Sequence, residues 1–238
     1  MADTTALRYV RHRPLLPDHA WDRLIDTRIT VAGVGGLGSN VCQLLARLAP
    51  LQLEIWDPAS IDEPDLNRQT LYTPSDLGLQ KVTVAERRLR DINPDLSIRT
   101  HARPISAEAF RAEDPKRTVI FDCLDSFAAR GALETIRRRD AIAVIHGGVE
   151  GTHGQACLLP AYGQGYSAIF GSDFGNAPPA GKPVAAHAVA AIASLQIGLL
   201  WDWARQERAG EGPGALLIYD GDRLTVDRIE LAGAERAR

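Results

Sequence analysis

The most constraining feature of the sequence is a glycine-rich turn between a strand pattern and a helix pattern. Residues 28–32 are a short run rich in β-branched side chains, and Gly33-Val34-Gly35-Gly36-Leu37-Gly38 follows it directly. Residues 37–48 then carry apolar side chains at helical spacing. Glycines in such a turn permit a tight bend, a close approach of backbone to phosphate, and close packing of helix on strand. This order is typical of the first unit of a nucleotide-binding fold.

Strand and helix patterns continue to alternate as far as residue 148. The strand patterns are short apolar runs bounded by turn residues, and the helix patterns repeat apolar residues every three or four positions. The further strands expected here are residues 51–56, 96–102, 118–121 and 141–145, and the further helices are residues 81–92, 106–112 and 126–139. This alternation predicts an α/β fold with a Rossmann-like, doubly wound and mostly parallel sheet.

The pattern changes after residue 148. Residues 160–183 are rich in glycine and proline and have no clear period, which predicts a flexible loop. The other expected elements are a strand at residues 154–159, a long helix from Pro183 to about residue 206, and a closing hairpin at residues 215–219 and 224–231. We therefore expect an added antiparallel C-terminal portion within a single domain that spans residues 1–238.

Composition and charge argue against several classes of protein. The 238 residues are 45% hydrophobic, which suffices for one substantial core, and the net charge of −3 gives no support for a nucleic-acid partner. No run approaches the roughly 20 apolar residues that cross a bilayer, and the first residues lack a signal-peptide pattern. Cys42, Cys123 and Cys157 are far apart and lie in apolar segments. They predict buried thiols in a cytoplasmic protein.

The glycine turn and the next strand together indicate a nucleotide site. Asp57 follows the strand at residues 51–56, where a carboxylate can accept hydrogen bonds from ribose hydroxyls. Backbone N–H groups at the start of the helix can hold an anion. The glycines expected to contact the nucleotide are Gly33, Gly35, Gly36 and Gly38. NAD, FAD and ATP can all be held in this way, so the turn alone leaves the nucleotide open.

Short motifs spread along the chain resemble those of the ThiF/MoeB/HesA family, the bacterial relatives of ubiquitin-activating enzymes. The motifs are Arg8-Tyr9-Val10-Arg11, the glycine turn, Asn67-Arg68-Gln69-Thr70-Leu71, Gly78-Leu79-Gln80-Lys81, Ile92-Asn93-Pro94 and Asp122-Cys123-Leu124-Asp125. Their order and spacing make the combination more specific than any one of them. The resemblance covers nearly the whole chain.

The resemblance implies an ATP-dependent adenylyltransferase that uses magnesium. Family members adenylate the C-terminal glycine of a small ubiquitin-like or sulfur-carrier protein that ends in Gly-Gly. Carried over by motif, Asp57 would hold the ribose, Arg68 and Lys81 the phosphates, and Asp125 the magnesium ion. Arg11 would reach into the partner subunit's site in a homodimer. Further nucleotide contacts would come from Asn67, Gln69, Asp122 and Leu124.

The resemblance also assigns roles to three parts of the domain. Residues 1–27 would form an N-terminal arm and helix, residues 28–148 the nucleotide-binding half, and residues 149–238 the carrier-binding half. The flexible loop at residues 160–183 would close over the carrier tail.

The chemistry independently favours these residue types. A carboxylate that attacks the α-phosphorus is repelled by the negative charge of the nucleotide, and fixed cations lower that barrier as charge develops. Magnesium prefers hard oxygen ligands and usually keeps several waters, so one or two carboxylates suffice. No general base is required, because a carboxylate is already ionised at neutral pH.

The sequence departs from the family in ways that limit what is carried over. Many members bind structural zinc through two Cys-x-x-Cys pairs, and neither pair is present here, so we expect no zinc. Members that form a covalent cysteine intermediate place the cysteine near the position of Pro179, and this stretch has none. We therefore expect adenylation without a covalent cysteine step. In addition, Asp65 stands where the family usually has asparagine.

Two alternatives remain open at this point. An NAD-dependent oxidoreductase would explain the glycine turn and Asp57 but would leave Arg68, Lys81 and Asp125 without roles. A catalytically weakened nucleotide-binding scaffold of the same fold is favoured by the missing zinc and cysteine motifs.

Overall fold

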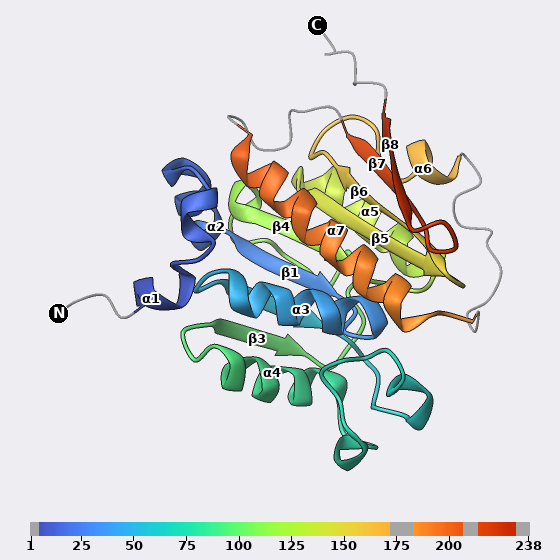
Figure 1. Ribbon diagram of the computed structural model, residues 1–238. Coiled ribbons are helices and arrows are strands. Elements are labelled where there is room, and N and C mark those ends of the chain that lie inside the picture. The colour runs from blue at the N-terminus through green and yellow to red at the C-terminus, as the bar shows by residue number, and fades with distance from the viewer. Residues whose placement is uncertain (1–4, 172–182, 207–213, 232–238) are drawn as a thin grey trace, which may run out of the picture.

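The computed structural model describes residues 5–171, 183–206 and 214–231 (Figure 1). One eight-stranded sheet runs through it in the order β3-β2-β1-β4-β5-β6-β7-β8. The strands are β1 (Arg28–Ala32), β2 (Gln52–Trp56), β3 (Ser97–His101), β4 (Thr118–Asp122), β5 (Ala143–Glu150), β6 (His153–Leu159), β7 (Ala215–Asp220) and β8 (Thr225–Glu230). β1 to β5 are parallel and β6 to β8 are antiparallel additions. The predicted fold class is confirmed.

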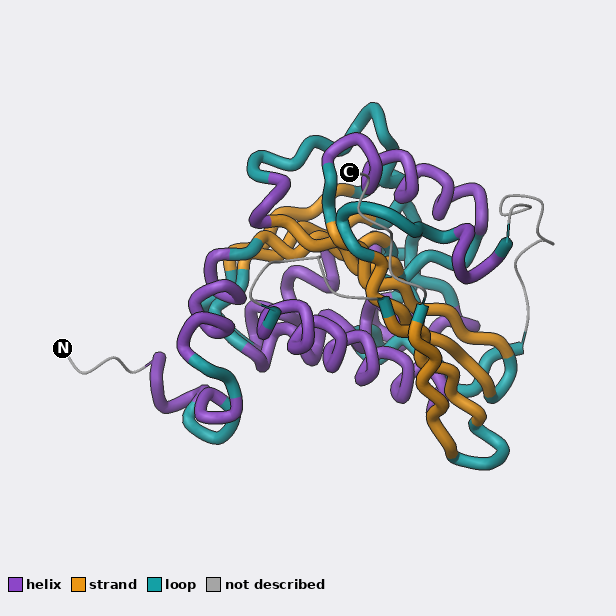
Figure 2. Tube along the Cα trace, turned by 90° about the horizontal axis from the view of Figure 1, so that it is seen from above, coloured by secondary structure: helices purple, strands orange, loops and turns teal. Residues whose placement is uncertain are grey.

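Helices cover both faces of the sheet (Figures 1 and 2). They are α1 (Thr5–Tyr9), α2 (Asp18–Asp26), α3 (Gly36–Leu48), α4 (Lys81–Ile92), α5 (Phe127–Asp140), α6 (Ser167–Phe170) and α7 (Ala186–Arg205), with 3₁₀ turns at Arg13–Leu15, Glu63–Asp65, Pro74–Asp76 and Pro115–Arg117. α3, α4 and α7 bury one hydrophobic cluster against the sheet, and α5 buries a second cluster on the other side. No helix within the described residues has the length and apolar content needed to cross a membrane.

Three element predictions are wrong in detail. The helix expected at residues 106–112 is absent, because Ser106 closes only a single turn through bonds from the N–H groups of Ala109 and Phe110. β5 runs well past residue 145, because its end pairs with β6. Pro183 does not open the long helix: its carbonyl accepts the N–H of Gly151, and α7 begins three residues later. Residues 172–182 of the predicted loop, which include the Pro179 stretch, and the tail lie outside the described residues, whereas residues 160–171 are described and contain α6.

The first strand and helix meet at the glycine turn. Gly33 has a φ of +87°, and its N–H donates to the carbonyl of Trp56 over 2.8 Å. A Cβ on Gly38 would lie 1.9 Å from the carbonyl oxygen of Gly33. The glycines therefore let β1 turn sharply into α3 and let the helix press against the turn.

Gly38→Ala is expected to lower the free energy of unfolding by about 3 kcal/mol or more, since the new methyl group meets rigid backbone at the upper end of overpacking costs. Urea denaturation measures this change. Gly131→Ala in α5 is the matched control, because a Cβ there meets nothing within 4 Å. That change is expected to stabilise the protein by about 0.5–1 kcal/mol. Equal losses in the two variants would contradict the packing described for the turn.

Candidate active site

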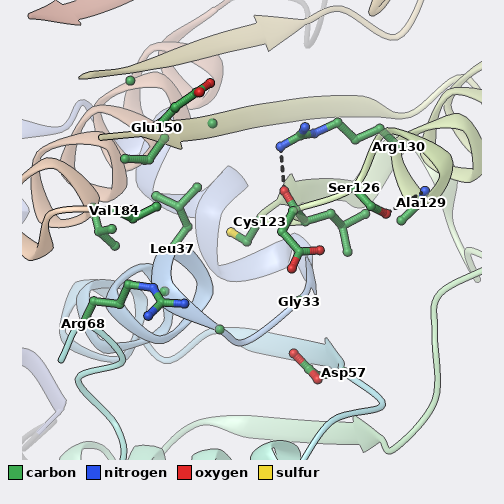
Figure 3. A pocket seen from close by; sticks show the side chains of 18 of the residues that line it. Gly33, Leu37, Asp57, Arg68, Cys123, Ser126, Ala129, Arg130, Glu150 and Val184 are labelled. Carbon is green, nitrogen blue, oxygen red and sulfur yellow. Dashed lines mark hydrogen bonds between the residues drawn. The ribbon is translucent and has the colours of Figure 1, made fainter. Parts of the chain in front are cut away.

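A cleft of about 870 Å³ opens where the parallel strands end (Figure 3). Its walls come from the turn after β1, the ends of β2 and β4, the start of α4, and the hairpin between β5 and β6. This edge lies beside the point where the strand order reverses between β1 and β4, which is where open α/β sheets bind their ligands. The volume is in the range of small-molecule sites.

Most of the predicted site residues share this cleft although they are far apart in sequence. Those that line it are Gly33, Gly35, Gly36, Asp57, Arg68, Gln69, Lys81, Leu124 and Asp125. Four others do not line it. Gly38 packs behind the turn, Asn67 is exposed and accepts a bond from Arg68, Asp122 is buried behind the cleft, and Arg11 lies on the exposed N-terminal arm.

Asp57 ties the second strand to the glycine turn. Its Oδ2 accepts the N–H of Val34 and its Oδ1 accepts the N–H of Ala59, each over 2.8 Å. Only 7% of the residue is exposed, yet it forms part of the cleft wall. Each carboxylate oxygen retains a lone pair. The group can therefore accept hydrogen bonds from a sugar hydroxyl without breaking its own structural contacts.

Lys81 and Arg68 bring two cations to the same wall. The Nζ of Lys81 lies 3.0 Å from Oδ2 of Asp65, and the lysine side chain is 9% exposed. Arg68 donates from Nη1 to the carbonyl of Pro64 over 2.9 Å, and its stem lies against Gly36. Both side chains are therefore held in place beside the glycine turn.

Asp65 has a larger part in the site than the sequence indicated. Its Oδ1 accepts the Nε2 of Gln69, while Oδ2 accepts the N–H of Asp62 and pairs with Lys81. One carboxylate thus orders the segment that carries Arg68 and fixes the side chain of Lys81. Gln69 keeps a buried Oε1 that has no hydrogen-bond partner in the described part of the chain. The departure from asparagine at residue 65 was the only signal for this arrangement.

Asp125 differs from the other acids. It is exposed in the connection between β4 and α5, lines the cleft, and forms no hydrogen bond or ion pair within the described residues. An accessible carboxylate of this kind is the ligand type that magnesium uses together with substrate phosphates and water. The residues present therefore fit a magnesium–nucleotide complex.

Asp122 organises a buried network behind the cleft. Its Oδ2 accepts the hydroxyl of Tyr166 and the Nδ1–H of His146, each over 2.7 Å, and the Nε of Arg130 over 3.2 Å. Burial by itself would raise the pKa of the Asp122 carboxyl, but Arg130, His146 and Tyr166 hold that pKa below its usual value. Asp122 is therefore a carboxylate whose negative charge is fully partnered.

His146 is neutral within this network. Burial lowers the pKa of its imidazole despite the neighbouring carboxylate. With Nδ1 donating to Asp122, Nε2 is left to accept the side-chain N–H of Gln155 over 3.3 Å. Gln155 lines the cleft. The histidine itself is fully buried and so supports the cleft wall from behind.

All three cysteines are free and buried. Burial raises the pKa of Cys42 and Cys157 to about 12. Cys123 lines the cleft but is only 8% exposed, and burial raises its pKa well above its usual value. None of the three is therefore a thiolate at neutral pH.

The family of the chain follows from comparison with known proteins. The model of the ThiF family matches residues 9–237. The chain belongs to the ThiF family. The predicted family is thus confirmed.

Two relatives whose names state an activity are similar to this ThiF-family protein. The SAMP-activating enzyme E1 of Haloferax volcanii is 29% identical over 171 residues, which cover 71% of this chain and 63% of the relative. The sulfur carrier protein ThiS adenylyltransferase of Escherichia coli K12 is 30% identical over 169 residues, which cover 69% of this chain and 67% of the relative. The match thus spans about two thirds of each relative.

Solved structures show the same fold at lower identity. Crystal structures of E. coli MccB and of PaaA superpose with TM-scores of 0.75 and 0.70 at 17% and 18% identity. The superposition covers 98% of this chain and 72% of MccB, and 97% of this chain and 75% of PaaA.

Proposed function

We propose that this ThiF-family protein is an ATP-dependent adenylyltransferase that activates the C-terminal glycine carboxylate of a ubiquitin-like sulfur carrier. The observation that carries the proposal is the convergence of Arg68, Lys81 and Asp125 on the cleft that holds the glycine turn and Asp57. One relative is named as a SAMP-activating enzyme and another as an adenylyltransferase of the sulfur carrier protein ThiS. A hydride-transfer site would give these three charged residues no task.

The residues divide the work of adenylation among them. The glycine turn and Asp57 hold the nucleotide by its phosphates and its ribose. Lys81 and Arg68 stabilise the charge that develops on the phosphates as the α–β bond breaks. Magnesium, held by Asp125, would neutralise further phosphate charge. Because the attacking carboxylate needs no base, positioning and electrostatics supply the catalysis.

The second end of the cleft would take the carrier tail. Gly148, Gly154, Val184, Val189 and Ile218 line the cleft there and offer small or apolar surface beside the polar side chains of Glu150, His153 and Gln155. A tail that ends in Gly-Gly suits such a surface, because it needs no room for side chains. We assign this end to the carrier and the end at Asp57 to the nucleotide.

We further propose that the protein acts as a homodimer in the cytoplasm. Arg11 is exposed and does not reach the cleft of its own chain. Beside it Leu7 and Val10 are 75% and 54% exposed, as expected of side chains that a second copy covers. Arg11 would then enter the partner's cleft. Sedimentation of the purified protein tests the dimer.

Adenylation is proposed to proceed without a covalent cysteine step and without zinc. The buried thiols support the first point, because the thiolate is the nucleophilic form. We expect iodoacetamide at pH 7.5 to leave all three cysteines unmodified for hours in the native protein and to label all three in urea, as measured by intact mass. Rapid labelling of Cys123 or Cys157 in the native protein would contradict this.

Nucleotide choice tests the proposal against the alternatives. Calorimetric titration is expected to show binding of Mg·ATP and no binding of NAD. Binding of NAD without ATP would overturn the proposed function in favour of an oxidoreductase. Binding of ATP without turnover on any carrier would favour a non-catalytic scaffold.

A further inference from the structure

Arg130 is a cleft-lining cation that none of the sequence motifs included. It comes from α5, and its side chain is 8% exposed. Nε donates to Asp122 over 3.2 Å, and Nη2 donates to the carbonyls of Leu124 and Gly147 over 2.6 and 3.4 Å. These contacts engage one edge of the guanidinium group and fix its plane.

Two aromatic rings, those of Phe127 and Phe170, also pack beside the guanidinium group of Arg130. The guanidinium carbon lies 5.3 Å from the ring centroid of Phe127 and 5.9 Å from that of Phe170. Both rings line the cleft with Arg130. Nη1 forms no hydrogen bond to any residue in the described ranges. The guanidinium is therefore oriented in advance and keeps two N–H donors for a ligand, and those donors suit an anion.

The position of Arg130 indicates which anion it takes. Arg68 and Lys81 lie on the wall beside the glycine turn, whereas Arg130 donates to the carbonyl of Gly147 in the middle of β5. In Figure 3, Arg68 and Arg130 extend into the cleft from opposite sides. In the proposed reaction, the triphosphate binds at the wall that carries Arg68 and Lys81. The second anion of the proposed reaction, the carrier carboxylate, must come from the opposite side to meet the α-phosphorus.

We propose that Arg130 binds the C-terminal carboxylate of the acyl substrate and that Asp122 positions Arg130 for this task. The inference rests on the proposed function. One carboxylate oxygen accepts from Nη1, and the other forms the new bond to the α-phosphorus. The bond between the α-phosphorus and the bridging oxygen breaks, and its electron pair leaves with pyrophosphate. Arg130 keeps its proton throughout and offsets the repulsion between the two anions.

The test compares a carrier with its C-terminal carboxamide. The probe is whichever small Gly-Gly-ending protein supports ATP–pyrophosphate exchange, prepared in both forms. Binding of each form is measured by calorimetry to the wild type, Arg130→Lys and Arg130→Gln. Arg138→Lys on the same helix is the matched control, because its side chain is 67% exposed. Mg·ATP affinity is measured for every variant and also reports correct folding.

The wild type is expected to bind the carboxylate form at least about tenfold more tightly than the amide, as a charge-assisted hydrogen bond provides. In Arg130→Gln this ratio is expected to fall to about one, with Mg·ATP affinity within about twofold of wild type. The ratio for Arg130→Lys is expected to lie between those of the wild type and Arg130→Gln, because lysine keeps the positive charge but not the planar guanidinium group. Arg138→Lys is expected to keep the wild-type carboxylate-to-amide ratio and the wild-type Mg·ATP affinity.

Several results would overturn the proposal. If the carboxylate-to-amide ratio survives in Arg130→Gln, Arg130 does not bind the carboxylate. If Mg·ATP affinity falls as much as carrier affinity while the melting temperature is unchanged, Arg130 is a nucleotide residue. Loss of the fold in both Arg130 variants would make it a structural residue. Absence of exchange with every carrier would overturn the proposed function itself, and this inference with it.

Discussion

Lys81→Ala is expected to lower carrier-dependent ATP–pyrophosphate exchange by about 10²–10³-fold, the loss typical when one preorganised donor to a developing negative charge is removed. The contacts of Lys81 favour a loss near the upper end of this range. Lys81 is paired with Asp65 at 3.0 Å, and both line the cleft. Without the lysine, the carboxylate of Asp65 keeps its hydrogen bonds from Gln69 and Asp62 but has no cationic partner, so its charge repels the triphosphate.

The control for this experiment is Lys116→Ala, the same change at an exposed lysine outside the cleft. We expect it to retain full exchange. Asp65→Asn, which installs the residue usual in the family, removes the repulsive partner and leaves the cation. Adding Asp65→Asn to Lys81→Ala is expected to restore part of the lost ATP affinity. Exchange at the wild-type rate in Lys81→Ala would remove the main support for phosphate binding on this wall.

Asp122→Ala is expected to destabilise the protein by about 3–5 kcal/mol, because it leaves the charge of Arg130 buried without its partner. The hydroxyl of Tyr166 and the imidazole of His146 lose their acceptor as well. Such a loss is a large share of the roughly 5–15 kcal/mol that stabilises a typical domain. The free energy of unfolding in urea measures the effect.

Asp91→Ala, at an exposed acid on α4, is the matched control and is expected to change stability by less than about 0.5 kcal/mol. Asp122→Ala/Arg130→Met removes both buried charges and is expected to recover much of the loss, since replacing a whole buried pair costs less than breaking it. If Asp122→Ala alone is as stable as the wild type, Asp122 is not the centre of the buried network.

The placement of the glycine turn and Asp57 in one cleft was predictable because their signals are local. The glycine turn, Asp57 and the order of elements around them follow from short-range patterns that the parallel sheet then brings together. Asp122 shows where that reasoning stops. Its motif placed it with the nucleotide ligands, whereas its partners His146 and Tyr166 come from β5 and the segment before α6. No spacing rule links these three positions.

The same limit explains the other differences. Arg130 carries no motif signal, and its orientation depends on Phe170, forty residues later in the chain. β5 extends because β6 returns beside it, which is a tertiary effect. At residues 106–112 only a first turn formed, closed by Ser106, although Phe110 is buried in the same hydrophobic cluster as residues of α5.

ATP–pyrophosphate exchange by the wild-type protein, with magnesium and each small Gly-Gly-ending protein of the same organism, measures adenylation of a carrier carboxylate directly. We predict exchange that requires one such carrier, requires its free C-terminal carboxylate, and disappears in Lys81→Ala. Exchange that is absent with every carrier although Mg·ATP binds, or that proceeds equally well with the carboxamide form, would contradict the assignment of this cleft to carboxylate adenylation.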